Sequence, residues 1–144
     1  MKEKSIILSG DQLTLEDVVS IARYYRKVQL TDNKNVKSRM NTSVDVISNA
    51  VDQRLPLYGV TTQFGGLATQ TIEKYMYEEL QSNLIAVFHM DTGPSLPLEV
   101  VRAAMVLRDN SHLIGTSGIR QIWNEYMIIF LMNNVTPLVS RLEH

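Results

Sequence analysis

Apolar residues recur every three to four positions along most of the chain, which is the spacing of helices with one buried face. The first such run follows Thr14, which forms an imperfect capping box with Asp17, and it predicts a helix from Leu15 to about Arg26. A second apolar stripe, from Val36 to Val51, predicts a helix that ends before Pro56, because the residue before a proline avoids the helical conformation.

Two more helices are predicted farther along the chain. The run from Ile72 to Val87 predicts a third helix with Thr71 as its N-cap, and the length of this run suggests a buried central element. Residues 91–95 include a Gly-Pro pair and end that helix. Pro97 then suits the first turn of a fourth helix, which runs through Leu107.

A fifth helix is predicted to begin near Ser117-Gly118 and to run through Phe130. Its second half is apolar on nearly all sides, so it needs cover on every face. Four preceding helices do not supply that much cover. We therefore expect a partner chain or further C-terminal sequence to cover it.

Two short apolar runs, Ile6–Leu8 and Val28–Leu30, are typical of strands and predict one small hairpin-like pair. The predicted fold class is mainly α with a short two-stranded β element. We expect one domain over residues 1–139. Residues 140–144 are interpreted as a vector-derived tail, because the chain closes on Leu-Glu-His, the start of a common histidine tag.

Composition excludes several classes of function. Fourteen basic and fifteen acidic residues give a formal net charge of −1, which offers no electrostatic footprint for nucleic acid or for an anionic membrane. The chain has no cysteine, which excludes disulfides and thiolate chemistry. The longest apolar run, Tyr126 to Met132, is far shorter than the roughly 20 residues of a membrane-spanning helix. With no signal peptide either, we expect a cytoplasmic protein without nucleic-acid or membrane partners.

The histidines and arginines predict no metal or anion site. The histidines lack metal-ligand spacing, and His89, close to Asp91 at the end of the third predicted helix, suits the negative end of the helix dipole. Arginines on helices are more often solvated than bound to a carboxylate, and Glu99 with Arg102 is typical of an i,i+3 surface pair. No metal is therefore expected, and the helical arginines are interpreted as surface residues: Arg102, Arg108 and Arg120.

The stretch from Tyr58 to Gly66 lies between two predicted helices and has neither helical nor strand periodicity. Its glycines permit positive φ angles, and Thr61 and Thr62 can bond back to the main chain. Such a composition more often marks a plain connection than a functional loop. Tyr58 is a candidate base, although a tyrosine acts as one only when neighbouring donors or positive charge lower its ordinary pKa of about 10.

Seven segments occur in a particular order along the chain: Leu13–Val19, Tyr58–Gly65, Leu80–Ile85, Val100–Met105, Asn110-Ser111, Ser117–Arg120 and Val135–Pro137. Together they resemble the N-terminal part of the aromatic amino acid ammonia-lyases and aminomutases, a family that includes histidine, phenylalanine and tyrosine ammonia-lyases. The resemblance spans nearly all of residues 8–139. It is much more specific than any one of these motifs.

The resemblance implies the N-terminal helical domain of the ammonia-lyase, or fumarase/aspartase-like, fold. It also implies β-elimination of ammonia from an aromatic L-amino acid, assisted by a 4-methylidene-imidazol-5-one electrophile that forms from an internal Ala-Ser-Gly. Tyr58 occupies the place of the family's base. Gly59, Leu84, Val87 and Phe88 fall at substrate-binding positions, and the family assembles as homotetramers.

Several positions depart from the family pattern. Gln63 replaces the usual glycine of the loop, as in some aminomutase-like members, and Thr116 stands where many members have tyrosine. Val87 and Phe88 cannot hydrogen-bond an imidazole or a phenol, which favours phenylalanine or a similar apolar substrate. A shift of one residue would bring in His89 and remove that preference.

The largest departure is that Ala-Ser-Gly occurs nowhere in the 144 residues. The chain alone is therefore expected to lack the electrophile and to be inactive. Two alternatives to an ammonia-lyase remain: a 2,3-aminomutase of the same family, or a natural truncated domain that binds or oligomerises without catalysis.

Overall fold

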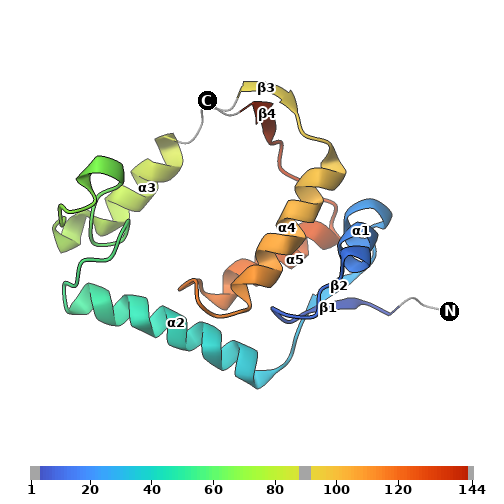
Figure 1. Ribbon diagram of the computed structural model, residues 1–144, viewed down its shortest axis with the longest axis horizontal. Coiled ribbons are helices and arrows are strands. Elements are labelled where there is room, and N and C mark those ends of the chain that lie inside the picture. The colour runs from blue at the N-terminus through green and yellow to red at the C-terminus, as the bar shows by residue number, and fades with distance from the viewer. Residues whose placement is uncertain (1–3, 88–91, 143–144) are drawn as a thin grey trace.

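The computed structural model describes residues 4–87 and 92–142 and is mainly α (Figure 1). Its α-helices are α1 (Leu15–Tyr24), α2 (Lys34–Asp52), α3 (Tyr77–Val87), α4 (Leu98–His112) and α5 (Gln121–Met132). Short strands β1 (Ile6–Leu8), β2 (Val28–Leu30), β3 (Thr92–Ser95) and β4 (Ser140–Leu142) form two two-stranded sheets. The predicted fold class is confirmed, with one more small sheet than expected.

Strands β1 and β2 lie where they were predicted, but their pairing is parallel, with Ile6 opposite Val28 and Leu8 opposite Leu30. The hairpin-like arrangement was therefore wrong. The physical reason is that α1 lies between the two strands in sequence, so the chain crosses over and enters both strands in the same direction. β3 and β4 pair in the antiparallel sense, so Ser140–Leu142, which was assigned to a tail, forms a strand.

The capping box of α1 is confirmed. The Asp17 N–H donates to Oγ1 of Thr14 at 3.1 Å, and the Thr14 N–H donates to Oδ2 of Asp17 at 3.2 Å. Two of the helix's free N–H groups are thereby satisfied. The helix ends at Tyr24, earlier than predicted, because Tyr25 adopts the left-handed conformation with φ 54°.

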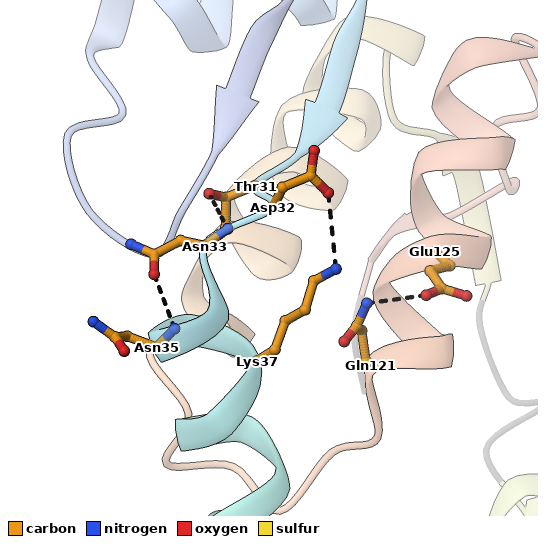
Figure 2. Close-up of polar contacts among 7 residues, drawn as sticks. All are labelled: Thr31, Asp32, Asn33, Asn35, Lys37, Gln121 and Glu125. Carbon is orange, nitrogen blue, oxygen red and sulfur yellow. Dashed lines mark hydrogen bonds and ion pairs between the residues drawn. The ribbon is translucent and has the colours of Figure 1, made fainter.

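Residues 31–33 join the end of β2 to the start of α2, and side-chain hydrogen bonds cap the helix there (Figure 2). The Asn35 N–H donates to Oδ1 of Asn33 at 2.9 Å, and the Asn33 N–H donates to Oγ1 of Thr31 at 3.2 Å. These bonds fix the direction in which the helix leaves the sheet. Asparagine is a favoured N-cap, so the start of this helix follows from local sequence.

Helix α3 begins later than predicted. Residues 74–76 form a 3-10 turn, and Thr71 pairs with Thr62 in an isolated antiparallel bridge instead of capping a helix. The prediction of Thr71 as N-cap was therefore wrong, because its backbone is used in that bridge. No residue of α3 is buried, so the prediction of a buried central element was also wrong for the described chain.

The core lies among β1, β2, α1, α4, α5 and the first two turns of α2, which gather on one side of Figure 1. α2 runs from this group to the opposite side, where the loop after it and α3 lie. The core side chains are mainly aliphatic and include Leu8, Ile21, Val28, Met40, Val106 and Leu131. Among the described residues, no helix is long and apolar enough to cross a membrane.

Helix α5 begins at Gln121, and the preceding glycines pack on α2. A Cβ atom at Gly118, which has φ +63°, would lie 2.5 Å from Cγ1 of Ile47, and the Gly118 N–H donates to Oγ of Ser43 at 3.2 Å. The start predicted near Ser117-Gly118 was therefore early. The helix itself exposes large apolar side chains, as its composition led us to expect: Ile122, Tyr126, Ile129, Phe130 and Met132.

Candidate functional site

The Tyr58 loop, residues 55–72, connects α2 to the 3-10 turn before α3. Its backbone is held by two buried threonine hydroxyls. Oγ1 of Thr61 donates to the Leu55 carbonyl at 2.6 Å and accepts from the Leu57 N–H at 2.7 Å. Oγ1 of Thr62 accepts from the Gly59 N–H at 3.3 Å. The expectation that these threonines bond back to the main chain is confirmed.

Tyr58 is 64% exposed. Its hydroxyl oxygen accepts a hydrogen bond from the Gly65 N–H at 3.4 Å. Its ring meets the Phe64 ring edge to face, with centroids 5.9 Å apart and planes at 86°. The phenol is thus accessible while the backbone beneath it is fixed.

Gly59 is required by the close approach of Phe64. It has φ +69°, and a Cβ atom there would lie 2.7 Å from Cε1 of Phe64. A side chain at this position would push the Phe64 ring away from Tyr58 and would strain the backbone. The glycine therefore shapes the pair of rings.

The loop is joined to α3 through Gly59, whose carbonyl accepts from Nε2 of Gln81 at 2.6 Å. Leu84 lies one helical turn beyond Gln81 and is half-buried, so it shares the face of α3 that meets the loop. Val87 is the last residue of α3 and is exposed. The structure thus places three of the predicted substrate-binding residues on neighbouring elements, whereas Phe88 and His89 lie outside the described residues.

A second polar group, in the α4–α5 interface, was missed by sequence reasoning. Arg102 was interpreted as a solvated side chain, but it is 2% exposed, so that prediction was wrong. Its guanidinium donates to the Ile21 carbonyl at 3.1 Å and to the Leu131 carbonyl at 3.3 Å. Glu99 pairs with Arg23 of α1 at 3.1 Å, so the predicted Glu99–Arg102 surface pair was also wrong.

Arg102 is buried where the C-terminal ends of α1 and α5 meet, and both ends supply carbonyl acceptors for its guanidinium. Ile21 and Leu131 lie in the last turns of α1 and α5, where carbonyl groups have few helical partners and the helix dipole is negative. The Leu131 carbonyl also accepts from the Asn134 N–H at 3.4 Å. The guanidinium also lies 4.4 Å from the ring centroid of Tyr25. Burial lowers the pKa of Arg102, and Tyr25 opposes that shift, but an arginine stays charged at neutral pH.

Asp109 is fully buried two turns after Arg102 on the same helix. Its carboxylate accepts from Nδ2 of Asn124 on α5 at 2.6 Å, and the same amide donates to the Asp109 carbonyl at 3.0 Å. Burial raises the pKa of Asp109 to about 7, and the Asn124 hydrogen bond opposes this shift. Asp109 therefore carries a proton over much of the acidic range.

His112 lies one turn beyond Asp109, and its ring packs against Trp123 with centroids 4.4 Å apart. Burial lowers the pKa of His112, and the nearby charge of Arg108 lowers it further. The spacing of Arg102, Asp109 and His112 could have revealed this buried stripe, because they share one helical face with Met105 and Val106. Within residues 4–87 and 92–142, no group of three or more His, Asp or Glu side chains could hold a metal ion.

Asp109→Asn is expected to change how stability depends on pH. The folded-state pKa of Asp109 lies above its value of 3.8 in the unfolded chain, so folding takes up a proton and stability is lost as pH rises from about 4 to 7. The isosteric amide removes that loss, and we expect the variant to be more stable than the parent at pH 8 by about 2 to 4 kcal/mol. The measurement is urea unfolding at pH 4, 6 and 8.

The gain should shrink steadily towards pH 4, where the folded parent carboxyl is protonated and the unfolded one is about half protonated. His112 acts in the opposite sense, since its lowered pKa costs stability as pH falls through about 6.5. It is present in both proteins and cancels in the difference. Asp45→Asn, at an exposed carboxylate on α2, serves as the control. Parallel pH curves for Asp109→Asn and the parent would contradict the assignment.

Comparison with solved structures defines the class of fold. The ergothionase of Treponema denticola, an ergothioneine-degrading enzyme, matches with a TM-score of 0.89 and 26% identity over 98% of this chain and 28% of that one. The tyrosine aminomutase of Streptomyces globisporus matches with a TM-score of 0.88 and 26% identity over 98% of this chain and 26% of that one. The chain therefore has the N-terminal architecture of ammonia-lyases and aminomutases.

Sequence comparison then assigns the family. The profile described as aromatic amino acid lyase matches residues 13–142. The phenylalanine ammonia-lyase of Nostoc punctiforme is 46% identical over 136 residues, 94% of this chain and 24% of that enzyme. The histidine ammonia-lyase of Treponema denticola is 37% identical over 139 residues, 96% of this chain and 27% of that enzyme. The chain belongs to the aromatic amino acid lyase family and spans about a quarter of the length of these relatives.

Proposed function

We propose that this chain is the N-terminal part of an aromatic amino acid ammonia-lyase and that Tyr58 is its catalytic base. The observation that supports this most is the exposed phenol on a loop whose backbone is fixed by Thr61 and Thr62. A base must be reachable by substrate and yet be held in one place. The Tyr58 loop meets both requirements.

In the proposed reaction Tyr58 reacts as the phenolate, whose oxygen takes the β-proton of the amino acid and becomes the phenol, while the amino group leaves from its ammonium form. The electrons of the broken C–H bond form the Cα–Cβ double bond, and the C–N bond breaks to release ammonia. The electrophile that the family resemblance implies would, once supplied, favour the departure of the amino group. The chain's own part is to present the phenol and to hold the aromatic ring of the substrate.

The residues of this chain do not fit the electrophile that the family uses. A methylidene-imidazolone needs Ala-Ser-Gly, and the 144 residues contain no such tripeptide. The nearest sequence, Thr116-Ser117-Gly118, has its glycine packed on Ile47, where the backbone is confined. A separate polypeptide segment would have to supply this electrophile.

The proposed substrate is phenylalanine or a similar apolar aromatic amino acid. Leu84 and Val87 are the described residues at the side-chain positions, and neither can hydrogen-bond an imidazole or a phenol. A 2,3-aminomutase is the runner-up, supported by Gln63 in the loop and by the fold shared with the tyrosine aminomutase. The two activities differ in their products, because an ammonia-lyase forms an unsaturated acid and a 2,3-aminomutase forms a β-amino acid.

We also propose that the active protein is an oligomer. Helix α5 exposes five large apolar side chains, and isolated domains rarely leave such a face in water. Other chains or other segments of a longer polypeptide would cover it.

A hybrid enzyme tests the proposal. This chain, joined in place of the matching quarter of the Nostoc punctiforme phenylalanine ammonia-lyase, is expected to form cinnamate from phenylalanine. Its rate should be no less than about one hundredth of the parent's, since a misplacement of about 1 Å costs about 100-fold. The chain alone is expected to form no product from phenylalanine, tyrosine or histidine. Absorbance follows the unsaturated acids, and chromatography detects β-amino acids.

The oligomeric state and circular dichroism of the hybrid show whether it has folded and assembled. An assembled hybrid without turnover would contradict the proposed function. Turnover by the chain alone would contradict the requirement for an outside electrophile. A β-amino acid as the main product would favour the aminomutase.

A further inference from the structure

Two backbone segments of the Tyr58 loop, residues 61–63 and 70–72, pair with one another. We call this paired region the neck of the loop. The Gln63 N–H donates to the Gln70 carbonyl at 3.1 Å, and the Ile72 N–H donates to the Thr61 carbonyl at 3.0 Å. Thr62 and Thr71 lie opposite one another between these two bonds. This is the pattern of a short antiparallel ladder, so Gln63 and Gln70 are direct cross-strand partners.

The side chains of Gln63 and Gln70 also interact, because Nε2 of Gln63 lies 3.4 Å from Oε1 of Gln70. Successive side chains of a strand point to opposite faces. Thr62 is buried and bonds towards Gly59, whereas Gln63 points to the other face of the neck. There it lines a pocket of about 200 Å³ with Ile72, with Met76 of the 3-10 turn and with three residues of α3: Glu79, Leu80 and Asn83.

The neck closes an excursion, residues 64–69, that touches Tyr58. Phe64 follows Gln63 directly and presents its ring to the Tyr58 ring, and the Gly65 N–H donates to the phenolic oxygen. Opening of the neck at Gln63 would therefore release both contacts to Tyr58. A glycine at this position, the usual residue of the family pattern, has no side chain with which to bond Gln70.

We propose that Gln63 is a positioning residue, which holds the neck closed through its cross-strand pair with Gln70 and so keeps Phe64 and Gly65 against Tyr58. This inference rests on the proposed function, since the position of the phenol matters for catalysis only if Tyr58 is the base. The pair itself is a property of the folded chain. It can therefore be tested without any turnover.

The test is residue-level hydrogen exchange by NMR on the 144-residue chain, with the Ile72 amide as reporter of the neck. Gln63→Ala and Gln70→Ala are each expected to speed exchange of this amide about two- to fivefold, the range of a cross-strand polar pair. The double variant should exchange no faster than the faster single variant, because the two side chains act as one unit. The nuclear Overhauser effect between the Tyr58 and Phe64 rings should weaken in each single variant.

Introducing an opposite-charge pair should restore the interaction across the neck. Gln63→Lys with Gln70→Glu restores a cross-strand attraction and is expected to return the Ile72 exchange rate to within twofold of the parent. Thr69→Ala, at an exposed position on the same excursion, is the matched control and should change nothing. The Thr31 amide, which donates to the Leu8 carbonyl in the core, should exchange at the parent rate in every variant.

Additive effects of the two single variants would overturn the proposal, and so would an unchanged Ile72 rate in either one. Equal acceleration at Thr31 would mean global destabilisation and would also overturn it. Because none of these measurements involves substrate, a failure of the Gln63–Gln70 pair is distinguishable from a failure of Tyr58 as the base.

Discussion

Tyr58→Phe is expected to lower kcat of the hybrid enzyme by about 10² to 10⁴, with little change in KM. The substitution removes only the phenolic oxygen, which we propose as the acceptor of the β-proton, and general base catalysis contributes about this much. The Phe64 ring contact and the threonine bonds beneath the loop are retained. Steady-state cinnamate formation from phenylalanine measures both constants.

Tyr75→Phe is the matched control, since Tyr75 lies in the 3-10 turn before α3 and is 82% exposed. It should leave kcat within about twofold of the unmodified hybrid, as surface substitutions usually do. If Tyr58→Phe turns over as fast as Tyr75→Phe does, the phenol is not the base. A rise in KM alone would instead assign Tyr58 to substrate binding.

Arg102→Met is expected to destabilise the chain by about 2 to 5 kcal/mol, the largest effect on stability that we foresee. Methionine retains an unbranched apolar stem but offers no donor. The carbonyls of Ile21 and Leu131 would then lose a buried partner at the ends of two helices. The contact with the Tyr25 ring would be lost as well. Urea unfolding followed by circular dichroism measures the change.

Two further variants separate charge from geometry. Arg102→Lys keeps the charge but has no planar fork, so it cannot serve both carbonyls in the same way, and an intermediate loss is expected. Arg108→Met, at an exposed position on the same helix, should stay within about 0.5 kcal/mol of the parent. If Arg102→Met were as stable as Arg108→Met, the guanidinium would not be needed at the two helix ends.

The elements that were predicted well are those whose signals are local. The capping box at Thr14, the apolar stripe of α2 and the strands Ile6–Leu8 and Val28–Leu30 appear as predicted. Each depends on residues within a few positions of one another. The errors occur where the backbone pairs with a residue farther along the chain. Threonine is a favoured N-cap residue, yet Thr71 pairs with Thr62 across the loop instead of capping a helix.

The Tyr58 loop and the buried polar residues of α4 differ in the same respect, namely whether their partners are near in sequence. The composition of the Tyr58 loop alone favoured a plain connection, and the loop was recognised because its contiguous motif takes its place in the ordered series that resembles the family. The role of Tyr58 as the base remains a prediction. Arg102 could not be read correctly, because the carbonyls that bury it belong to α1 and α5, far away in sequence. The buried Asp109 was missed for a similar reason, since its partner Asn124 lies on another helix.

By itself, the sequence determined the helical class, the strand positions and the order of motifs that resembles the ammonia-lyases, because periodicity, caps and motifs are properties of neighbouring residues. Tertiary structure decided the parallel pairing of β1 with β2, the burial of Arg102 and Asp109 and the closure of the loop at Gln63 and Gln70. Those features depend on contacts between residues distant in sequence, whose geometry exists only once the chain has folded.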